Sequence, residues 1–295
     1  MNVCVIGLGL MGSALAKRLR NSGYNVILYN RTIDKAYRLA DEINAKVAET
    51  PRECCSSSDI TAIFVADDNA LIDVVFPPNG FADSSRGKDI VNMSTVSTAV
   101  SERIYRVIEA NGGNYVESPV YGSVSEVLEG RLVAIVASNK NINENVKQFL
   151  SSISKKIMYV GNIPKAMALK LALNQLNMVI VATLAETLSF LKINEIDYSL
   201  LEELVRGTWM EPILSRFMKR ALEEHPPRFR IELAAKDLQS FIESARIKKL
   251  NTPITAAAMH RYLEATLHNY GDKDYPNITK YIIDTINKQN TKTKQ

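Results

Sequence analysis

Cysteine and histidine are scarce in this chain, which has three of each among its 295 residues. Cys54 and Cys55 are adjacent, Cys4 lies in an apolar run, and no CxxC or Cys/His ligand spacing is present. A structural zinc site needs such a spacing, so we expect no metal site. So few cysteines without a framework are typical of a reducing compartment.

An excess of one charge sign is also missing. Three lysines lie in the last nine residues, NKQNTKTKQ (287–295), and this segment has no acidic residue. Without those lysines the formal net charge falls from +4 to +1. The sequence therefore indicates no basic face for nucleic acid, and we expect no nucleic-acid partner.

Targeting and membrane segments are not evident either. The chain begins directly with a strand-like run, without a charged region and a long apolar core, so we expect no secretory signal. The longest apolar segment, AMALKLALNQLNMVIVA (166–182), is interrupted by Lys170, Asn174 and Asn177. Such polar positions argue against a membrane-spanning helix, so we predict a cytoplasmic protein with no membrane partner.

What the chain does contain is an alternation of segment types across its first half. Strand-like runs occupy residues 2–7, 25–30, 61–66, 89–94, 114–120, 132–138 and 156–161. Helix-like segments such as residues 13–23 separate most of them. Strands that alternate with helices of this length are typical of parallel βαβ units. We therefore predict an α/β fold whose N-terminal domain, residues 1–162, is a Rossmann-type doubly wound sheet.

The second half has a different pattern, with no convincing strand. Helical runs cover residues 164–192, 198–206, 211–224, 231–248, 253–268 and 276–288. Pro253 and Pro276 suit the first turn of a helix. We predict an all-helical domain for substrate binding and dimerisation at residues 163–288, followed by a polar tail at 289–295.

The strongest single motif is the glycine loop in VCVIGLGLMGSALAKRL. Gly7, Gly9 and Gly12 have the spacing of a dinucleotide-binding loop, between a strand and a helix. The first glycine permits the tight turn, the second lets backbone approach a pyrophosphate, and the third lets the helix pack on the strand. We therefore assign cofactor contacts to the loop: Gly7, Leu8, Gly9, Leu10, Met11 and Gly12.

The end of the second strand indicates which dinucleotide is bound. An NAD site usually places Asp or Glu here, to hold the ribose 2′-hydroxyl. This chain has Asn30, Arg31 and Thr32 instead. Arg31 can pair with a 2′-phosphate that a carboxylate would repel, and Thr32 can add a hydroxyl. We therefore predict NADP as the cofactor.

The apolar helix at 166–182 carries one narrow polar stripe. Lys170, Asn174 and Asn177 are spaced i, i+4 and i+7, so they share a face. A charge buried without partners is unfavourable, and a lone helical lysine usually faces solvent. The alternative is that this helix lines an active-site cleft and that Lys170 acts there.

Five short motifs bear on that alternative. They are GLGLMG (7–12), NMSTVS (92–97), ESPVYGSVSEVLEG (117–130), KLALN (170–174) and KDL (236–238). In this order the chain resembles the β-hydroxyacid dehydrogenase family, over roughly residues 1–286. That family includes 3-hydroxyisobutyrate dehydrogenases, glyoxylate/succinic semialdehyde reductases and related imine reductases. The resemblance implies a 6-phosphogluconate dehydrogenase-like fold and an oxidoreductase.

The resemblance also implies roles for individual residues. Lys170 matches the catalytic lysine of the family, and Asn174 matches the amide one turn on. Thr95 matches a position that touches the nicotinamide, and Lys236 matches a lysine that reaches the cofactor. These four residues are therefore expected to act on the cofactor or the reacting groups.

Substrate contacts are expected from a second set: Ser94, Tyr121, Gly122, Ser123, Trp209 and Phe229. Gly122 matches a loop whose backbone amides hold a substrate carboxylate. The family often has Ser-Gly-Gly where this chain has Tyr121-Gly122-Ser123, although the aldehyde reductase branch also has Gly-Ser. Trp209 and Phe229 can wall the pocket, and ordinary packing is an equal alternative for both.

These expectations combine into one chemical hypothesis. Hydride transfer to a carbonyl builds negative charge on its oxygen, which the Lys170 ammonium can stabilise and then protonate. We predict an NADP(H)-dependent oxidoreductase for short aldehyde acids or β-hydroxyacids, most like glyoxylate/succinic semialdehyde reductase. The alternatives are a 3-hydroxyisobutyrate dehydrogenase, an imine reductase and a non-catalytic NADP-binding assembly module. The long apolar helix favours a homodimer or homotetramer.

Overall fold

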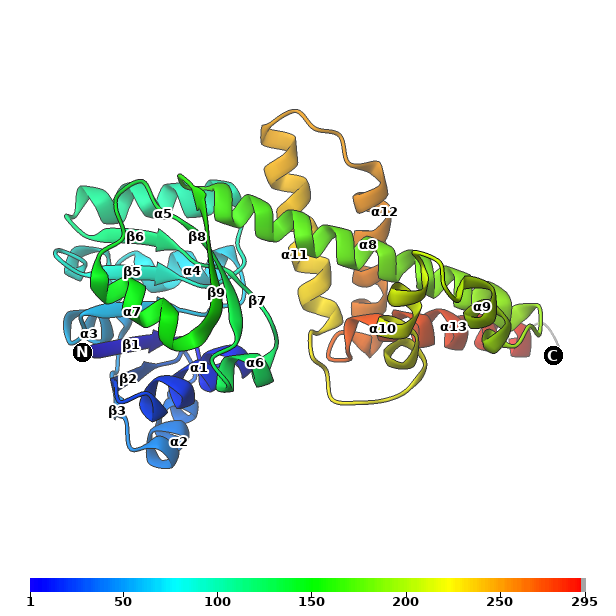
Figure 1. Cartoon of the computed structure of the whole chain (residues 1–295), viewed down its shortest axis with the longest axis horizontal. Coiled ribbons are helices and arrows are strands. Elements are labelled where there is room, and N and C mark those ends of the chain that lie inside the picture. The colour runs from blue at the N-terminus through cyan, green and yellow to red at the C-terminus, as the bar shows by residue number, and fades with distance from the viewer. Residues whose placement is uncertain (293–295) are drawn as a thin grey trace. The chain divides into compact units, whose positions relative to one another are not determined.

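The computed structural model describes residues 1–292 and contains two compact units. The first is Met1–Leu171 and the second is Ala172–Gln295. Helix α8 (Lys165–Ile193) begins in the first unit and ends in the second (Figure 1). The division therefore lies inside a helix that directly follows the predicted joint.

A nine-stranded sheet forms the centre of the first unit. Its strands are β1 (Asn2–Ile6), β2 (Asn25–Tyr29), β3 (Lys46–Val47), β4 (Ile60–Ile63), β5 (Asp89–Asn92), β6 (Asn114–Glu117), β7 (Val120–Tyr121), β8 (Leu132–Ala137) and β9 (Ser154–Gly161). The order is β3-β2-β1-β4-β5-β6-β8-β7, with β9 on β8. The first six strands of this spatial order, β3-β2-β1-β4-β5-β6, are parallel to their neighbours. Strand β8 is antiparallel to both β6 and β7. The doubly wound prediction is confirmed, with a mixed edge.

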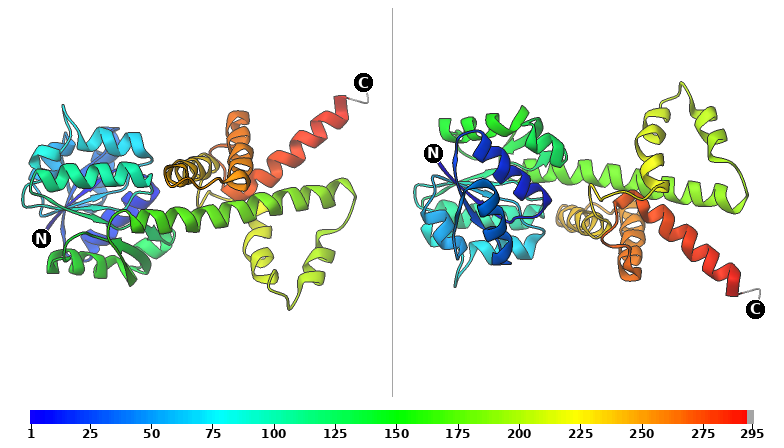
Figure 2. Two further views of the ribbon diagram at one scale, coloured as in Figure 1. Left: turned by 90° about the horizontal axis from the view of Figure 1, so that it is seen from above. Right: turned by 90° about the horizontal axis from the view of Figure 1, so that it is seen from below.

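Helices cover both faces of this sheet (Figure 2). They are α1 (Leu10–Asn21), α2 (Ile33–Ile43), α3 (Pro51–Ser56), α4 (Asp68–Val75), α5 (Thr98–Ala110), α6 (Val124–Leu128) and α7 (Glu144–Ile153), with a 3₁₀ turn η1 (Ala82–Ser84). Because side chains alternate along a strand, Val3 and Val5 join the core beneath α1 and α7. Cys4 and Ile6 join the other core, beneath α3, α4 and α5. Burial on both faces explains the continuous apolar runs in the sequence.

The carboxyl ends of five parallel strands lie in one row. Ile6 pairs with Tyr29 on one side and Ile63 on the other. Ile63 pairs with Asn92, which pairs in turn with Glu117. The loops that follow these strands therefore meet at one edge, where ligands bind in open α/β sheets. The glycine loop, the Asn30 segment and the Ser94 segment all begin at this edge.

Two of the three cysteines are bonded to each other, which their spacing in the sequence did not indicate. Cys4 of β1 and Cys54 of α3 form a disulfide bond across a sequence separation of 50, and Cys55 is a buried free thiol. Three cysteines without a framework are typical of a reducing compartment, whereas the structure joins two of them. Packing of α3 onto β1 brings the two side chains together, and spacing alone does not reveal that contact. The cytoplasmic location stays a prediction.

The second unit is helical, as predicted. It holds the rest of α8, followed by α9 (Tyr198–Val205), α10 (Glu211–Leu222), α11 (Ile231–Ile247), α12 (Pro253–Ala265), the turns η2 (Thr266–Tyr270) and η3 (Tyr275–Asn277), and α13 (Ile278–Lys292). Its core includes Met178, Phe217, Leu238 and Tyr262, each at most 6% exposed. Helix α13 extends into the predicted polar tail, of which residues 293–295 lie outside the described residues.

Helix α8 is long and apolar enough to span a membrane by length and composition. Of its most apolar window, 39% is buried inside the structure. The absence of a membrane partner remains a prediction.

Candidate active site

The glycine loop has the backbone geometry that its sequence requires. Gly7 has φ +93°, and a Cβ there would lie 2.2 Å from the Phe64 carbonyl oxygen. A Cβ on Gly12 would lie 1.9 Å from the Gly7 carbonyl oxygen. Any side chain at either position would clash with backbone, so the turn and the close approach of α1 both depend on glycine.

Gly9 differs, because no heavy atom lies within 4 Å of where its Cβ would be. It is the N-cap of α1, which has no side-chain cap and no acidic residue in its first turn. The first N–H groups of this helix are thus left for another acceptor, and the helix dipole favours an anion there. This open position fits the pyrophosphate of a dinucleotide.

The other residues of the loop have different environments. Leu8 is buried and Leu10 is 60% exposed, while Met11 is half-buried. The backbone N–H of Leu8 donates to the Asn30 side-chain oxygen at 2.9 Å. The Asn30 amide nitrogen donates to the Thr32 carbonyl oxygen, also at 2.9 Å. The Asn30 side chain therefore braces the glycine loop against the end of β2.

Arg31 and Thr32 are exposed beside this brace. Arg31 forms no ion pair with any residue between 1 and 292, and Thr32 is the N-cap of α2 without using its side chain as a cap. No acidic residue occupies the end of β2. The guanidinium and the hydroxyl are thus exposed beside the end of β2, and their contact with a 2′-phosphate stays a prediction.

The segment after β5 is held by the end of β4. The Ser94 hydroxyl accepts from the Val65 N–H at 2.9 Å and donates to the Ile63 carbonyl at 3.2 Å. Ser94 is 2% exposed, whereas Thr95 is half-buried. In this structure Ser94 orders the loop, and its predicted substrate contact stays a prediction.

The predicted substrate loop follows β6. Tyr121 is 38% exposed, and Gly122 has φ +146°, in the region that favours glycine. The Ser123 N–H donates to Glu126 at 2.8 Å, and the Ser123 hydroxyl also bonds to this carboxylate. These two bonds lower the pKa of Glu126 to about 2, and the bond from the Ser123 hydroxyl has the larger effect. The Ser123 side chain is therefore engaged at the start of α6.

Lys170 lies on α8, in the first unit with the substrate loop. Its ammonium is 6.0 Å from the centroid of the Tyr121 ring, within the range of a cation–π contact. Lys170 is half-buried. Its predicted partner on the helix, Asn174, follows one turn later and belongs to the second unit.

A buried carboxylate joins two predicted residues in the second unit. The Asn174 amide donates to Asp237 Oδ2 at 2.5 Å, and the Lys236 ammonium lies 2.5 Å from Asp237 Oδ1. Asp237 is 2% exposed. It holds the amide and the ammonium together, so it is a functional candidate that was not predicted from the sequence. Its signal was an acidic residue on the apolar face of a predicted helix.

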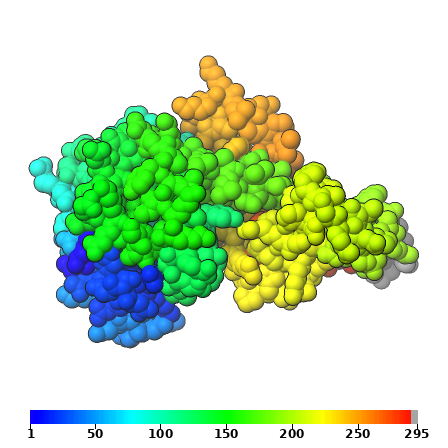
Figure 3. Space-filling model, viewed as in Figure 1, coloured from blue at the N-terminus to red at the C-terminus, as the bar shows by residue number. Residues whose placement is uncertain are grey.

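The two predicted aromatic residues are placed differently. Trp209 is 78% exposed, between α9 and α10, the surface helices coloured yellow in Figure 3. Phe229 is half-buried and packs edge-to-face on Tyr275, with the ring centroids 6.1 Å apart. Its backbone N–H donates to the fully buried Asp274 at 3.0 Å. Phe229 thus has a fixed position, whereas the Trp209 side chain is exposed to solvent.

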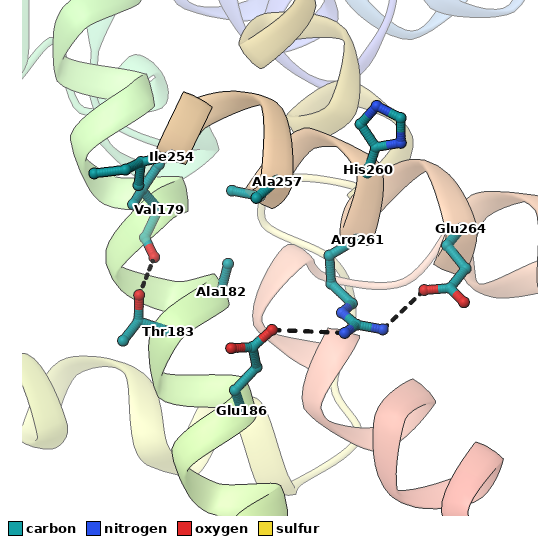
Figure 4. Close-up of a pocket in the computed structure, with 10 residues that line it drawn as sticks. Val179, Ala182, Thr183, Glu186, Ile254, Ala257, His260, Arg261 and Glu264 are labelled. Carbon is teal, nitrogen blue, oxygen red and sulfur yellow. Dashed lines mark hydrogen bonds and ion pairs between the residues drawn. The ribbon is translucent and has the colours of Figure 1, made fainter. Parts of the chain in front are cut away.

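A groove of about 670 Å³ lies between α8 and α12 of the second unit (Figure 4). Arg261 lies in it between two carboxylates, at 3.5 Å from Glu186 and 2.8 Å from Glu264. None of the predicted catalytic or cofactor residues lines this groove. It is therefore separate from the candidate active-site residues.

Comparison with known protein families gives two matches that together cover most of the chain. Residues 2–161 match the NAD-binding domain of 6-phosphogluconate dehydrogenase. Residues 165–282 match the NAD-binding domain of NADP-dependent 3-hydroxyisobutyrate dehydrogenase. The interval between the matches contains Pro164, directly before α8.

Individual proteins are similar over nearly the same length. Glyoxylate/succinic semialdehyde reductase 2 of Arabidopsis thaliana is 30% identical, over 93% of this chain and 77% of that protein. The cytokine-like nuclear factor N-PAC of Homo sapiens is also 30% identical, over 91% of this chain but 49% of that protein. The chain thus spans about half of N-PAC. A solved structure of Psf3 with NADP⁺ and 2-OPP has a TM-score of 0.79 at 22% identity, covering 96% of this chain and 100% of that one.

Proposed function

Since the chain belongs to the β-hydroxyacid dehydrogenase family of NAD(P)-dependent oxidoreductases, which act on CH–OH groups, we propose that it reduces a short aldehyde acid with NADPH. The activity most similar to the proposed one is that of glyoxylate/succinic semialdehyde reductases. The observation that carries the proposal is Lys170, a half-buried ammonium beside the Tyr121 ring of the substrate loop.

The bound nicotinamide supplies the hydride, and the protein must manage the charge on the substrate oxygen. The Lys170 ammonium stabilises that charge and donates a proton to the oxygen. In the direction of oxidation the same side chain accepts the proton. The Tyr121 ring bounds the space around the ammonium on one side.

The Asp237 carboxylate orients the side chains of Asn174 and Lys236. It accepts from Asn174 and pairs with Lys236, so both side chains keep a fixed orientation in the second unit. In the proposed mechanism Asn174 orients the substrate oxygen without adding charge, and Lys236 contacts the cofactor. The exposed backbone of Gly122 suits a substrate carboxylate.

The cofactor is NADP(H) in this proposal. Arg31 is exposed without an ion-pair partner among residues 1–292, and no acidic residue occupies the end of β2, where it would repel a 2′-phosphate. The family match over residues 165–282 is to an NADP-dependent enzyme. The open backbone around Gly9 suits the pyrophosphate common to both dinucleotides.

NADPH oxidation with glyoxylate, succinic semialdehyde and methylmalonate semialdehyde tests the proposal. Lys170→Ala should lower kcat by about 10²- to 10⁴-fold while NADPH still binds. Lys165→Ala, an exposed lysine on the same helix, is the matched control and should keep full activity. Full activity in Lys170→Ala, or no turnover of any substrate, would refute the assignment.

The pattern of substrates separates the alternatives within the family. Preference for methylmalonate semialdehyde favours a 3-hydroxyisobutyrate dehydrogenase, and turnover of cyclic imines alone favours an imine reductase. The third alternative is a non-catalytic NADP-binding assembly module, and the similarity to N-PAC, a protein named as a nuclear factor and spanned to about half by this chain, keeps it open. A rise in Tm with NADPH, without turnover of any substrate, would support that module.

We also propose a homodimer or homotetramer. Helix α8 exposes Leu176, Phe190 and Ile193 to 56%, 62% and 54%. Exposed apolar side chains gathered on one helix mark an interaction surface. Sedimentation velocity should give a species larger than the 32.9 kDa chain, and Leu176→Glu should dissociate it. A monomeric wild type would contradict this proposal.

A further inference from the structure

Glu117 is a fully buried acidic residue at the carboxyl end of β6. Its Oε2 accepts from the backbone N–H groups of Ala166 and Met167, at 3.1 and 3.2 Å. These N–H groups belong to the first turn of α8, where a helix has no internal acceptor for them. Glu117 thus caps α8 from another element, and its charge complements the helix dipole.

The other carboxylate oxygen receives a chain of hydrogen bonds. Ser101 Oγ lies 2.5 Å from Glu117 Oε1 and 3.0 Å from the Tyr115 hydroxyl, which accepts from Asn92 Nδ2 at 2.9 Å. The Asn92 side-chain oxygen accepts from the Ser94 N–H at 3.1 Å, and this bond fixes the orientation of the amide.

The direction of the chain follows from its two ends. Asn92 can only donate through Nδ2, so Tyr115 donates to Ser101 and Ser101 donates to Glu117. A continuous set of buried hydrogen bonds therefore runs from the Ser94–Thr95 segment to the first turn of α8. All of these groups belong to the first unit.

We propose that Glu117 is a positioning residue for Lys170, because it fixes the first turn of α8 relative to the Ser94–Thr95 segment. Lys170 follows Ala166 and Met167 by one turn of the same helix, so a shift of that turn displaces the ammonium directly. The inference rests on the proposed role of Lys170 as the acid. It assigns Glu117 no contact with the substrate.

The charge of Glu117 makes this arrangement sensitive to pH. Burial raises the pKa of Glu117 to about 7, and the hydrogen bond from Ser101 opposes that rise. The titratable groups that interact with it are Glu102 on α5 and Tyr115 on β6, and α8 carries Lys165 and Lys170 in its first two turns. A neutral Glu117 must donate its own proton to Ser101, which reverses the bond between these two residues and weakens the cap.

The test compares kcat against pH, from 5.5 to 8.5, in wild type and Glu117→Gln. The glutamine keeps the size and one acceptor oxygen but cannot ionise. We expect a wild-type kcat that rises through an inflection near pH 7, and a variant kcat that lacks it and is about 10- to 100-fold lower. The KM for NADPH should stay unchanged. A variant that keeps both the inflection and kcat would overturn the inference.

Ser101→Ala gives a second test that leaves the carboxylate in place. Loss of the opposing hydrogen bond should move the inflection to higher pH, and an unmoved inflection would overturn the inference. Asp89→Asn is the matched control, because Asp89 is a buried carboxylate at the opposite, amino end of β5. It accepts from Asn114 and Asn143 and should keep the wild-type profile.

Lys170→Ala distinguishes a failure of the proposed function from a failure of the positioning role. If that variant is fully active, the proposed function fails first. If it is inactive while Glu117→Gln keeps the wild-type kcat and pH profile, only the positioning role fails.

Discussion

Replacement of Glu117 by Gln should change how the stability of the first unit depends on pH. Glu117 is fully buried, and burial raises its pKa from an ordinary value of 4.5 to about 7. The folded state therefore holds this proton more tightly than the unfolded state. Between these two pH values the unfolded state has released the proton while the folded state retains it, so stability falls as pH rises.

The size of the effect follows from the two pKa values. A tenfold change in proton affinity corresponds to about 1.4 kcal/mol, so the displacement from 4.5 to about 7 corresponds to about 3 kcal/mol. The glutamine does not titrate. The free energy of unfolding of wild type minus that of the variant should therefore fall by about 3 kcal/mol from pH 4.5 to pH 8, and stay constant below pH 4.5.

The assay must report on the first unit alone. Trp209, the only tryptophan, lies in the second unit, so its fluorescence follows that unit. Hydrogen exchange of peptides from β5 and β6, measured at increasing urea concentrations by mass spectrometry, follows the first unit instead. A difference between the two proteins that is independent of pH would refute the reasoning, because it would mean that Glu117 ionises normally in the fold.

Three further outcomes are expected from residues outside this network. Arg31→Ala should raise the KM for NADPH about 10-fold or more and leave the KM for NADH unchanged, because only NADPH carries the 2′-phosphate. Equal changes of the two KM values in steady-state kinetics would contradict the cofactor assignment. Reduction of the Cys4–Cys54 bond should lower the stability of the first unit by about 2–4 kcal/mol, measured by hydrogen exchange with and without dithiothreitol, and an unchanged value would argue against the bond. Asp274→Ala should lower the stability of the second unit by about 3–5 kcal/mol, because it leaves the largely buried Arg220 without the carboxylate 2.7 Å away. Urea unfolding followed by Trp209 fluorescence measures this change, and an effect below about 1 kcal/mol would contradict the role of Asp274.

The elements of the fold could be predicted because their signals are local. Apolar runs of strand length that alternate with amphipathic segments predicted β1, β2, β4, β5 and β6 but not the two-residue β3, and helical periodicity predicted α8 to α13. The direction of β8 could not be predicted, because an apolar run can pair with its neighbour in either a parallel or an antiparallel arrangement. The pairing of Cys4 with Cys54 depends on how α3 packs on β1, which periodicity does not specify.

The candidate site was predicted where the motif itself dictates geometry. Gly7 and Gly12 are required by close backbone contacts, so their roles follow from spacing. Asn30 was expected at the cofactor, but its amide bonds within the chain, and this orientation depends on a loop 22 residues away. Glu117 and Asp237 were overlooked as functional residues because a buried acid shows its role only through its partners.

The path of α8 limits how this protein could be recombined with its relatives. A chimera joined between Leu171 and Ala172, where the compact units divide, would take Lys170 from one parent and Asn174 from the other. A joint before Lys165 would keep that pair but separate Glu117 from the helix that it caps. A functional exchange of halves therefore has to transfer an acid at position 117 and the first turns of α8 together, so these segments should be inherited as one block.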